Sequence, residues 1–131
     1  MLVLLPPSET KRRGGEGPPL ALDRLAHPTL TTLRSRVVDA LVDLSGDEEE
    51  SARTLKLGKT QLADIGLNAV ARVSPTMAAV DRYTGVLFDA LDARGLDDDS
   101  RAWLAAHVQI HSAPFGPVGA MDGIPAYRMS A

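Results

Sequence analysis

The feature that most constrains the fold is the apolar run from Met1 to Leu5, which Pro6 and Pro7 bring to an end. Five apolar residues without polar alternation are typical of a strand that is buried on both faces. Proline cannot donate to a sheet ladder, so strand pairing is expected to end near Pro6. The sequence therefore predicts a short central strand at the amino terminus of an α/β domain.

Polar side chains follow that strand directly. In open α/β sheets the ligand crevice lies beyond the carboxyl ends of the strands, so polar groups at this position are candidate ligand contacts. They are Ser8, Glu9, Thr10 and Lys11. An ordinary solvated loop is the alternative interpretation of the same residues.

The strongest helical pattern extends from Thr29 to Leu44. Apolar residues recur there at three- and four-residue steps, which predicts one stripe packed on the core. The stripe consists of Leu30, Leu33, Val37, Val38, Leu41 and Leu44. The acidic runs at 47–50 and 97–99 are expected to open further helices, because carboxylates are favourable at a helix N-terminus.

Two later segments have local signatures of their own. Ser74 followed by Pro75 is typical of a helix start, with the serine as N-cap and the proline at the first helical position. The segment after it, Ala78 to Arg82, fits either a helix end or a strand. Val108 to Ile110 alternates in the manner of a strand.

No metal site or cofactor is expected from this sequence. The chain has no cysteine, which excludes thiolate ligands. His107 and His111 are four residues apart, and in a strand that spacing separates them by about 13 Å, too far to share a metal. Gly58-Lys59-Thr60 matches the end of a phosphate-binding loop, but Arg53 stands where such a loop requires glycine.

The charge pattern is uneven. A net charge of −3 argues against broad affinity for nucleic acids, yet basic residues also cluster locally. The candidate nucleic-acid contacts are Lys11, Arg12, Arg13, Arg34 and Arg36. No segment approaches the about 20 apolar residues of a membrane span, and a chain without cysteine fits the cytoplasm.

Four stretches of the chain also form an ordered set of motifs. They are Leu2–Lys11, Arg82–Gly85, Ser112–Asp122 and Ile124–Ala131. In order and spacing this set resembles the peroxide stress protein YaaA family in its actinobacterial-type form. The resemblance implies an α/β fold in which a mixed β-sheet has a buried N-terminal strand surrounded by helices. Family members run past the point where this chain stops, so we expect residues 1–131 to be a single YaaA-like domain cut at its C-terminal end.

The resemblance extends the set of candidate ligand contacts. It brings the Tyr83-Thr84-Gly85 motif and the Tyr127-Arg128 pair to the loop that follows the first strand. Tyr83 offers a hydroxyl and a flat ring at the mouth of the crevice, and the alternative interpretation is a core tyrosine with one satisfied hydroxyl. Arg128 offers a planar fork for phosphate or carboxylate.

The resemblance also implies a function. It indicates a peroxide-stress response protein that limits oxidative damage from unincorporated iron, in which double-stranded DNA is a candidate partner. The alternative is an enzyme that acts on a small phosphorylated or carboxylated ligand in the crevice. No catalytic triad or acid–base pair can be assembled from the sequence, so we favour a role other than enzyme.

Overall fold

The computed structural model describes residues 1–130 and confirms the α/β class with a mixed sheet. The first sheet has the order β1 (Val3–Leu5), β4 (Val108–Ser112), β5 (Gly116–Gly119), with β1 parallel to β4 and β4 antiparallel to β5. The second sheet is antiparallel and has the order β2 (Gly17–Pro19), β3 (Pro75–Ala78), β6 (Gly123–Ile124). Ala131, the last residue of the fourth family-like stretch, lies outside the described residues.

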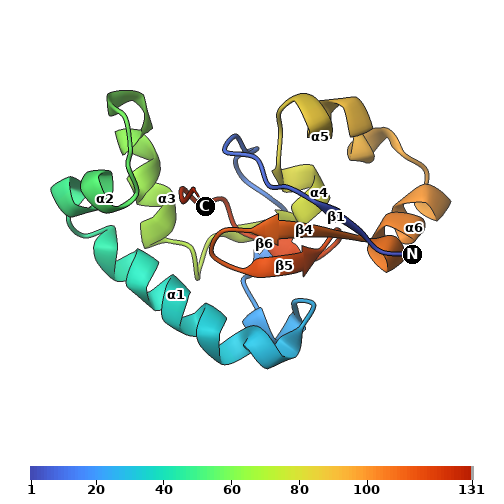
Figure 1. Ribbon diagram of the computed structural model, residues 1–131, viewed down its shortest axis with the longest axis horizontal. Coiled ribbons are helices and arrows are strands. Elements are labelled where there is room, and N and C mark those ends of the chain that lie inside the picture. The colour runs from blue at the N-terminus through green and yellow to red at the C-terminus, as the bar shows by residue number, and fades with distance from the viewer. Residues whose placement is uncertain (131) are drawn as a thin grey trace.

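The helices gather at two ends of the molecule, with the strands between them (Figure 1). One end holds α1 (Thr31–Leu44), α2 (Glu48–Thr54) and α3 (Ile65–Ala69), and the other holds α5 (Val86–Leu91) and α6 (Asp98–His107). The single-turn helix α4 (Ala79–Arg82) directly follows β3. Short 3-10 turns complete the chain: η1 (Leu22–Arg24), η2 (Pro28–Leu30), η3 (Lys59–Asp64) and η4 (Ala93–Gly95).

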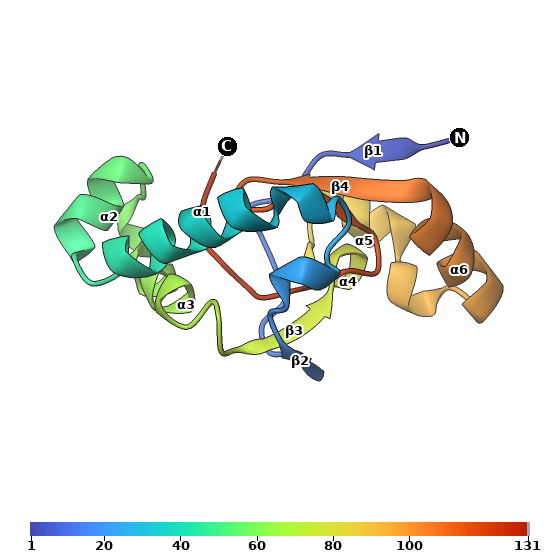
Figure 2. The same cartoon turned by 90° about the horizontal axis from the view of Figure 1, so that it is seen from below.

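Strand β1 lies at the edge of its sheet, next to β4 (Figure 2). Val3 and Leu5 are half-buried and pack against the core, whereas Leu4 is 57% exposed. The apolar run predicted a strand that is buried on both faces. That prediction is wrong, because the face that carries Leu4 is exposed. An uninterrupted apolar run reports a preference for extended backbone but does not reveal whether a second layer covers the outer face.

The core is formed by aliphatic and aromatic side chains from both sheets and the surrounding helices. Ile110, Val118 and Ile124 have no exposed surface, and Val38 of α1 packs against the same cluster. The predicted apolar stripe of α1 is only partly correct, because Leu33 is 58% exposed. The buried face of α1 contains Arg34 together with Val38 and Leu41.

The capping predictions can be compared directly with the backbone. Asp47 accepts a hydrogen bond from the backbone N–H of Glu50 and begins α2, and Asp97 does the same with Ser100 for α6, as predicted. The helix start predicted at Ser74-Pro75 is wrong. Pro75 begins β3, which pairs with β2 and β6, and proline is tolerated as the first residue of a strand.

Two buried arginines fix segments that are distant in sequence. Arg82 has no exposed surface, and its guanidinium donates to the carbonyls of Ile124, Arg12, Gly14 and Pro75 at 2.7–3.2 Å. Burial lowers the pKa of Arg82, and its positive charge is balanced by carbonyl dipoles. Arg82 thereby anchors the loop that contains the basic residues of the N-terminal segment.

Arg34 is the second buried arginine that joins segments distant in the sequence. It is 2% exposed and donates to the carbonyls of Phe115, His27 and Pro117. Its prediction as a nucleic-acid contact is incompatible with this burial, and the residue instead links α1 to the turn between β4 and β5.

Within residues 1–130, no helix has both the length and the apolar character needed to cross a membrane.

Candidate functional site

The segment that follows β1 runs antiparallel to the Arg82–Thr84 segment. Lys11 and Tyr83 form an isolated β-bridge, flanked by backbone bonds from the Arg12 N–H to the Arg82 carbonyl (2.8 Å) and from the Thr84 N–H to the Thr10 carbonyl (3.0 Å). Backbone hydrogen bonds therefore hold the predicted loop at a defined place beside the Tyr-Thr-Gly motif.

The Lys11 side chain enters a cavity of about 140 Å³, which we name the lysine cavity. Its lining consists of Glu9, Thr10, Lys11, Arg13, Asp64, Leu67, Tyr127 and Arg128. Five of the predicted ligand contacts therefore line this cavity, namely Glu9, Thr10, Lys11, Tyr127 and Arg128. Tyr83 lies beside them, and its ring centroid is 5.7 Å from the Lys11 Nζ.

The amine of Lys11 lies over the aromatic rings of Tyr83 and Tyr127. Its Nζ lies 4.2 Å from the centroid of the Tyr127 ring and donates a hydrogen bond of 3.1 Å to the carbonyl of Glu9. Burial lowers the pKa of this amine to about 8, and the positive charge of Arg128 acts in the same direction. Lys11 is consequently a less basic amine than an ordinary surface lysine.

The two tyrosine rings are joined through their hydroxyls. The hydroxyl of Tyr127 lies 2.6 Å from that of Tyr83 and 3.2 Å from that of Ser112. Burial raises the pKa of both phenols above the ordinary value, so both are neutral hydrogen-bonding groups at physiological pH. Ser112 therefore adds a third buried hydroxyl to this hydrogen-bonded group without lining the cavity, and the sequence did not single it out as a ligand contact.

Two arginines share one carboxylate at the rim of the lysine cavity. The Asp64 carboxylate accepts hydrogen bonds from Arg13 on one oxygen and from Arg128 on the other, with Arg128 Nε at 3.0 Å. Burial would raise the pKa of Asp64, but the hydrogen bonds from the two arginines outweigh it and hold the pKa below its ordinary value. Asp64 was missed by sequence reasoning because η3 brings it here from a segment without a recognisable motif.

The remaining predicted ligand contacts surround the cavity without lining it. The hydroxyl of Ser8 lies 3.2 Å from that of Thr10, which in turn donates to the carbonyl of Thr84. Gly85 has a φ of 112°, and a Cβ there would lie 3.1 Å from the Ser8 hydroxyl. A side chain at this position would be strained, so glycine lets the two segments approach closely.

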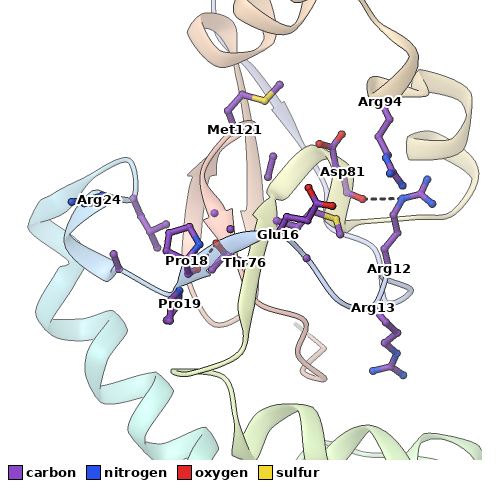
Figure 3. Close-up of a pocket in the computed structure, with 17 residues that line it drawn as sticks. Arg12, Arg13, Glu16, Pro18, Pro19, Arg24, Thr76, Asp81, Arg94 and Met121 are labelled. Atoms are coloured by element: carbon purple, nitrogen blue, oxygen red, sulfur yellow. Dashed lines mark hydrogen bonds between the residues drawn. The ribbon is translucent and has the colours of Figure 1, made fainter.

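A second and larger cavity lies beside the second sheet, and we name it the arginine hollow. Its volume is about 690 Å³, and its lining includes Arg12, Arg13, Arg24 and Arg94, all of them exposed. Figure 3 shows Arg24 on one side of the hollow and the other three arginines on the opposite side. Gly15, with φ of 138°, forms part of its wall, where a Cβ would collide with the carbonyl of Thr76 at 2.5 Å.

The lining of the arginine hollow contains more cationic than acidic side chains. Asp81 is half-buried, and its carboxylate is bound by both terminal nitrogens of Arg101 at 3.0 and 2.8 Å. Glu16 is the other acidic residue of the lining. Among the predicted nucleic-acid contacts, Arg12 and Arg13 line the hollow, Lys11 lies in the lysine cavity, and Arg36 is exposed on α1 outside both cavities.

The described residues offer no metal-binding arrangement. Between residues 1 and 130, no three histidine, aspartate or glutamate side chains converge in a way that could hold an ion. Nδ1 of His107 lies 2.8 Å from the carbonyl of Met1, and Nε2 of His27 lies 2.9 Å from the amide oxygen of Gln109.

Comparison with known proteins identifies the family. The family model described as "Peroxide stress protein YaaA" matches residues 1–131. A UPF0246 protein of Corynebacterium glutamicum is 42% identical over 130 residues, and one of Corynebacterium efficiens is 45% identical over 130 residues; each match covers 99% of this chain and 51% of the relative. A UPF0246 protein of Streptomyces coelicolor is 40% identical over 131 residues, which cover 99% of this chain and 50% of that protein. The chain therefore spans about half the length of the curated relatives it matches. On this match along its whole length, the chain belongs to the peroxide stress protein YaaA family.

Proposed function

We propose that this protein acts in the cytoplasm against peroxide stress, that it limits the oxidative damage caused by unincorporated iron, and that it does so by binding duplex DNA. The match to the peroxide stress family supports the first part. The DNA-binding part depends on one observation, the gathering of four exposed arginines around the arginine hollow.

The distribution of charge is compatible with this proposal despite the net charge of −3. The acidic runs that open α2 and α6 lie at opposite ends of the molecule (Figure 1), and the run at α6 begins three residues after Arg94 of the hollow. DNA affinity depends on the local density of cationic groups that can replace counterions on the phosphates. Arginine is well suited to this contact because its planar guanidinium can bind a phosphate through two N–H groups.

The proposal is tested by the salt dependence of DNA binding. We expect fluorescence anisotropy with a labelled duplex to give a logarithmic affinity that falls with the logarithm of salt between about 50 and 200 mM, with a slope of about −0.9 for each phosphate contact. Replacing Arg24 and Arg94 by alanine together should make that slope less steep by about 2.

A matched double variant controls for net charge. Arg53 and Lys56 are exposed, in α2 and just after it, and lie outside the arginine hollow. Their double replacement by alanine removes the same charge and should leave both affinity and slope close to those of the unmodified protein. Equal losses in the two double variants, or an affinity that does not respond to salt, would contradict a DNA contact at the hollow.

The protective role needs a second measurement. A supercoiled plasmid exposed to ferrous iron and hydrogen peroxide should accumulate fewer strand breaks with the unmodified protein than with the Arg24/Arg94 variant. Comparable protection by both proteins would separate peroxide protection from DNA binding at the hollow and would refute the proposed link between them.

The lysine cavity supports a second candidate function, an enzyme that acts on a small phosphorylated or carboxylated ligand. The specific observation is that Lys11, Tyr127 and Arg128 meet at one cavity although they come from opposite ends of the chain. If this function is correct, Lys11→Ala and Glu9→Gln should abolish peroxide protection while thermal unfolding stays cooperative. Full protection by both variants would exclude it.

A further inference from the structure

Lys11 differs from every other lysine of this chain in its surroundings. The sequence has two more lysines, and both are exposed: Lys56 follows α2, and Lys59 is the first residue of η3. Lys11 is half-buried, and its amine opens into the lysine cavity. The chain therefore contains one half-buried lysine amine and two exposed lysine amines, which serve as internal references.

The position of the Lys11 amine is well defined. The β-bridge to Tyr83 fixes the Lys11 backbone, and the Tyr127 ring at 4.2 Å and the Glu9 carbonyl at 3.1 Å fix its Nζ. An amine held at one place beside an open cavity presents its nitrogen to a ligand without first losing rotational freedom.

Burial favours the neutral form of the amine, and the charged groups around it act in both directions. The charged and titratable groups that face it are Glu9, Arg13, Asp64, Tyr83, Tyr127 and Arg128. The Asp64 charge is shared between two arginines, and Glu9 accepts a hydrogen bond from Ser130 at 2.9 Å. With Lys11 protonated, the lining has three cationic side chains and two carboxylates, an excess of one positive charge that favours a ligand with one negative charge. When Lys11 is neutral the charges of the lining balance, and Arg128 remains as the partner of a ligand carboxylate.

The size of the cavity limits the ligand. A volume of about 140 Å³ corresponds to roughly four or five water molecules, which suits a molecule of about six heavy atoms. The planar guanidinium of Arg128 lies at the cavity wall, where its free N–H groups can bind a carboxylate.

We propose that Lys11 is a nucleophilic amine that condenses with a small 2-oxo acid in the lysine cavity, with Arg128 holding the acid's carboxylate. This inference rests on the second candidate function and names its ligand class. The Nζ lone pair forms a bond to the carbonyl carbon, and the carbonyl π electrons move to oxygen. Both amine protons leave with that oxygen as one water molecule, which yields an imine without any oxidation or reduction.

The amine of Lys11, with its pKa of about 8, is partly neutral at pH 7. Relative to an amine with the ordinary value of 10.5, it supplies roughly 300 times more of the reactive form at that pH. A weaker base is also a weaker nucleophile, so the net advantage in rate is smaller, on the order of tenfold or somewhat more.

Trapping with cyanoborohydride tests the inference directly. The purified protein is incubated with glyoxylate and sodium cyanoborohydride, which reduces an imine to a stable carboxymethyl amine but spares the free aldehyde, and peptides are analysed by mass spectrometry. At pH 7 we expect Lys11 to be modified at least tenfold faster than Lys56 and Lys59, with a rate that rises around pH 8. Equal rates at the three lysines would overturn the proposal.

Two variants separate the roles of the residues. Lys11→Arg keeps the positive charge and should abolish modification at this position while the other two lysines react as before. Arg128→Gln should lower the ratio of the glyoxylate rate to the propanal rate at Lys11, because propanal lacks the carboxylate. That ratio does not depend on the pKa of the amine, so an unchanged ratio would overturn the role of Arg128.

Calorimetric titration of acetate and inorganic phosphate into the same protein distinguishes this inference from the function on which it rests. Binding of either anion without trapping of glyoxylate would overturn the nucleophile and leave the second candidate function intact. Absence of both binding and trapping would overturn both.

Discussion

The hydroxyl oxygens of Tyr83 and Tyr127 lie 2.6 Å apart in the interior of the protein, although the two residues are 44 positions apart in the chain. Both side chains are almost completely buried, and their rings meet edge to face at 6.4 Å. The pair links the Tyr-Thr-Gly motif to the last described segment and forms the floor beneath the Lys11 amine.

This arrangement predicts unequal effects of removing either hydroxyl. Tyr127→Phe leaves both the Tyr83 and the Ser112 hydroxyls one partner short, whereas Tyr83→Phe affects only the bond to Tyr127. We expect losses in the free energy of unfolding of about 2 kcal/mol and about 1 kcal/mol respectively. Urea denaturation measures both, and a larger loss for Tyr83→Phe would contradict the central position of the Tyr127 hydroxyl.

Arg82 is expected to be among the most sensitive positions for stability. Arg82→Lys retains a charge but cannot supply donors to four carbonyls, so it leaves buried acceptors unsatisfied at a cost of about 3–5 kcal/mol. Arg72→Lys is the matched control, because Arg72 pairs with an exposed Asp39 and such a pair contributes about 1 kcal/mol or less. Similar thermal unfolding midpoints for the two variants would refute the anchoring role of Arg82.

The Lys11 amine predicts a rise of stability with pH on the alkaline side. Below pH 8 the amine is protonated in both the folded and the unfolded states, and burial of its charge opposes folding. Between pH 8 and 10.5 the folded protein has lost this proton while the unfolded chain retains it, so stability increases with pH.

Lys11→Met removes the group that titrates. The unmodified protein should therefore gain on the order of 2 kcal/mol relative to this variant between pH 8 and 10.5. Lys59→Met, at an exposed position, retains Lys11 and should therefore show the same rise of stability with pH as the unmodified protein. Urea unfolding at intervals of pH measures the difference, and parallel pH profiles for the unmodified protein and Lys11→Met would contradict the lowered pKa.

The Asp64 carboxylate predicts the opposite dependence in acid. Its pKa is lower in the folded protein, so its contribution is complete above the ordinary value of 3.8 and disappears as the pH falls through the folded value. Asp64→Asn should cost about 2 kcal/mol at pH 7, because it leaves two guanidinium groups without their shared partner, and should cost less below pH 3.8.

Asp39→Asn serves as the control for this carboxylate, since it removes an exposed ion pair with Arg72. It should lower the free energy of unfolding by less than about 1 kcal/mol at pH 7. If Asp64→Asn lowers the free energy of unfolding by no more than Asp39→Asn does, or if its effect is the same in acid as at pH 7, the two arginines do not depend on this carboxylate.

The sequence was informative where structure is decided locally. The helix predicted from Thr29 to Leu44 is present as α1 from Thr31, and the acidic caps at Asp47 and Asp97 are in place, because capping and periodicity depend on neighbours a few residues away. The strand at Val108 was recognisable for the same reason. Ser74-Pro75 gave a helix signal, but pairing of β3 with two distant strands determined the outcome.

What the sequence could not predict depends on partners far along the chain. The apolar run of β1 did not reveal its edge position, because β4, its neighbour, lies more than 100 residues later. Arg34 and Arg82 could not be distinguished from surface arginines, since their carbonyl partners come from separate loops. The family resemblance indicated that Lys11, Tyr127 and Arg128 are important, and their convergence at one cavity became visible only in three dimensions.

The β-bridge between Lys11 and Tyr83 has a consequence for how the protein can respond to a ligand. Backbone bonds on both sides of Lys11 join its segment to the Arg82–Thr84 segment, so a shift of the main chain there would require several bonds to break together. Within this segment, adjustment to a bound molecule is therefore expected in the side chains and not in the main chain. Amide hydrogens at Arg12 and Thr84 should exchange with solvent as slowly after a ligand binds as before.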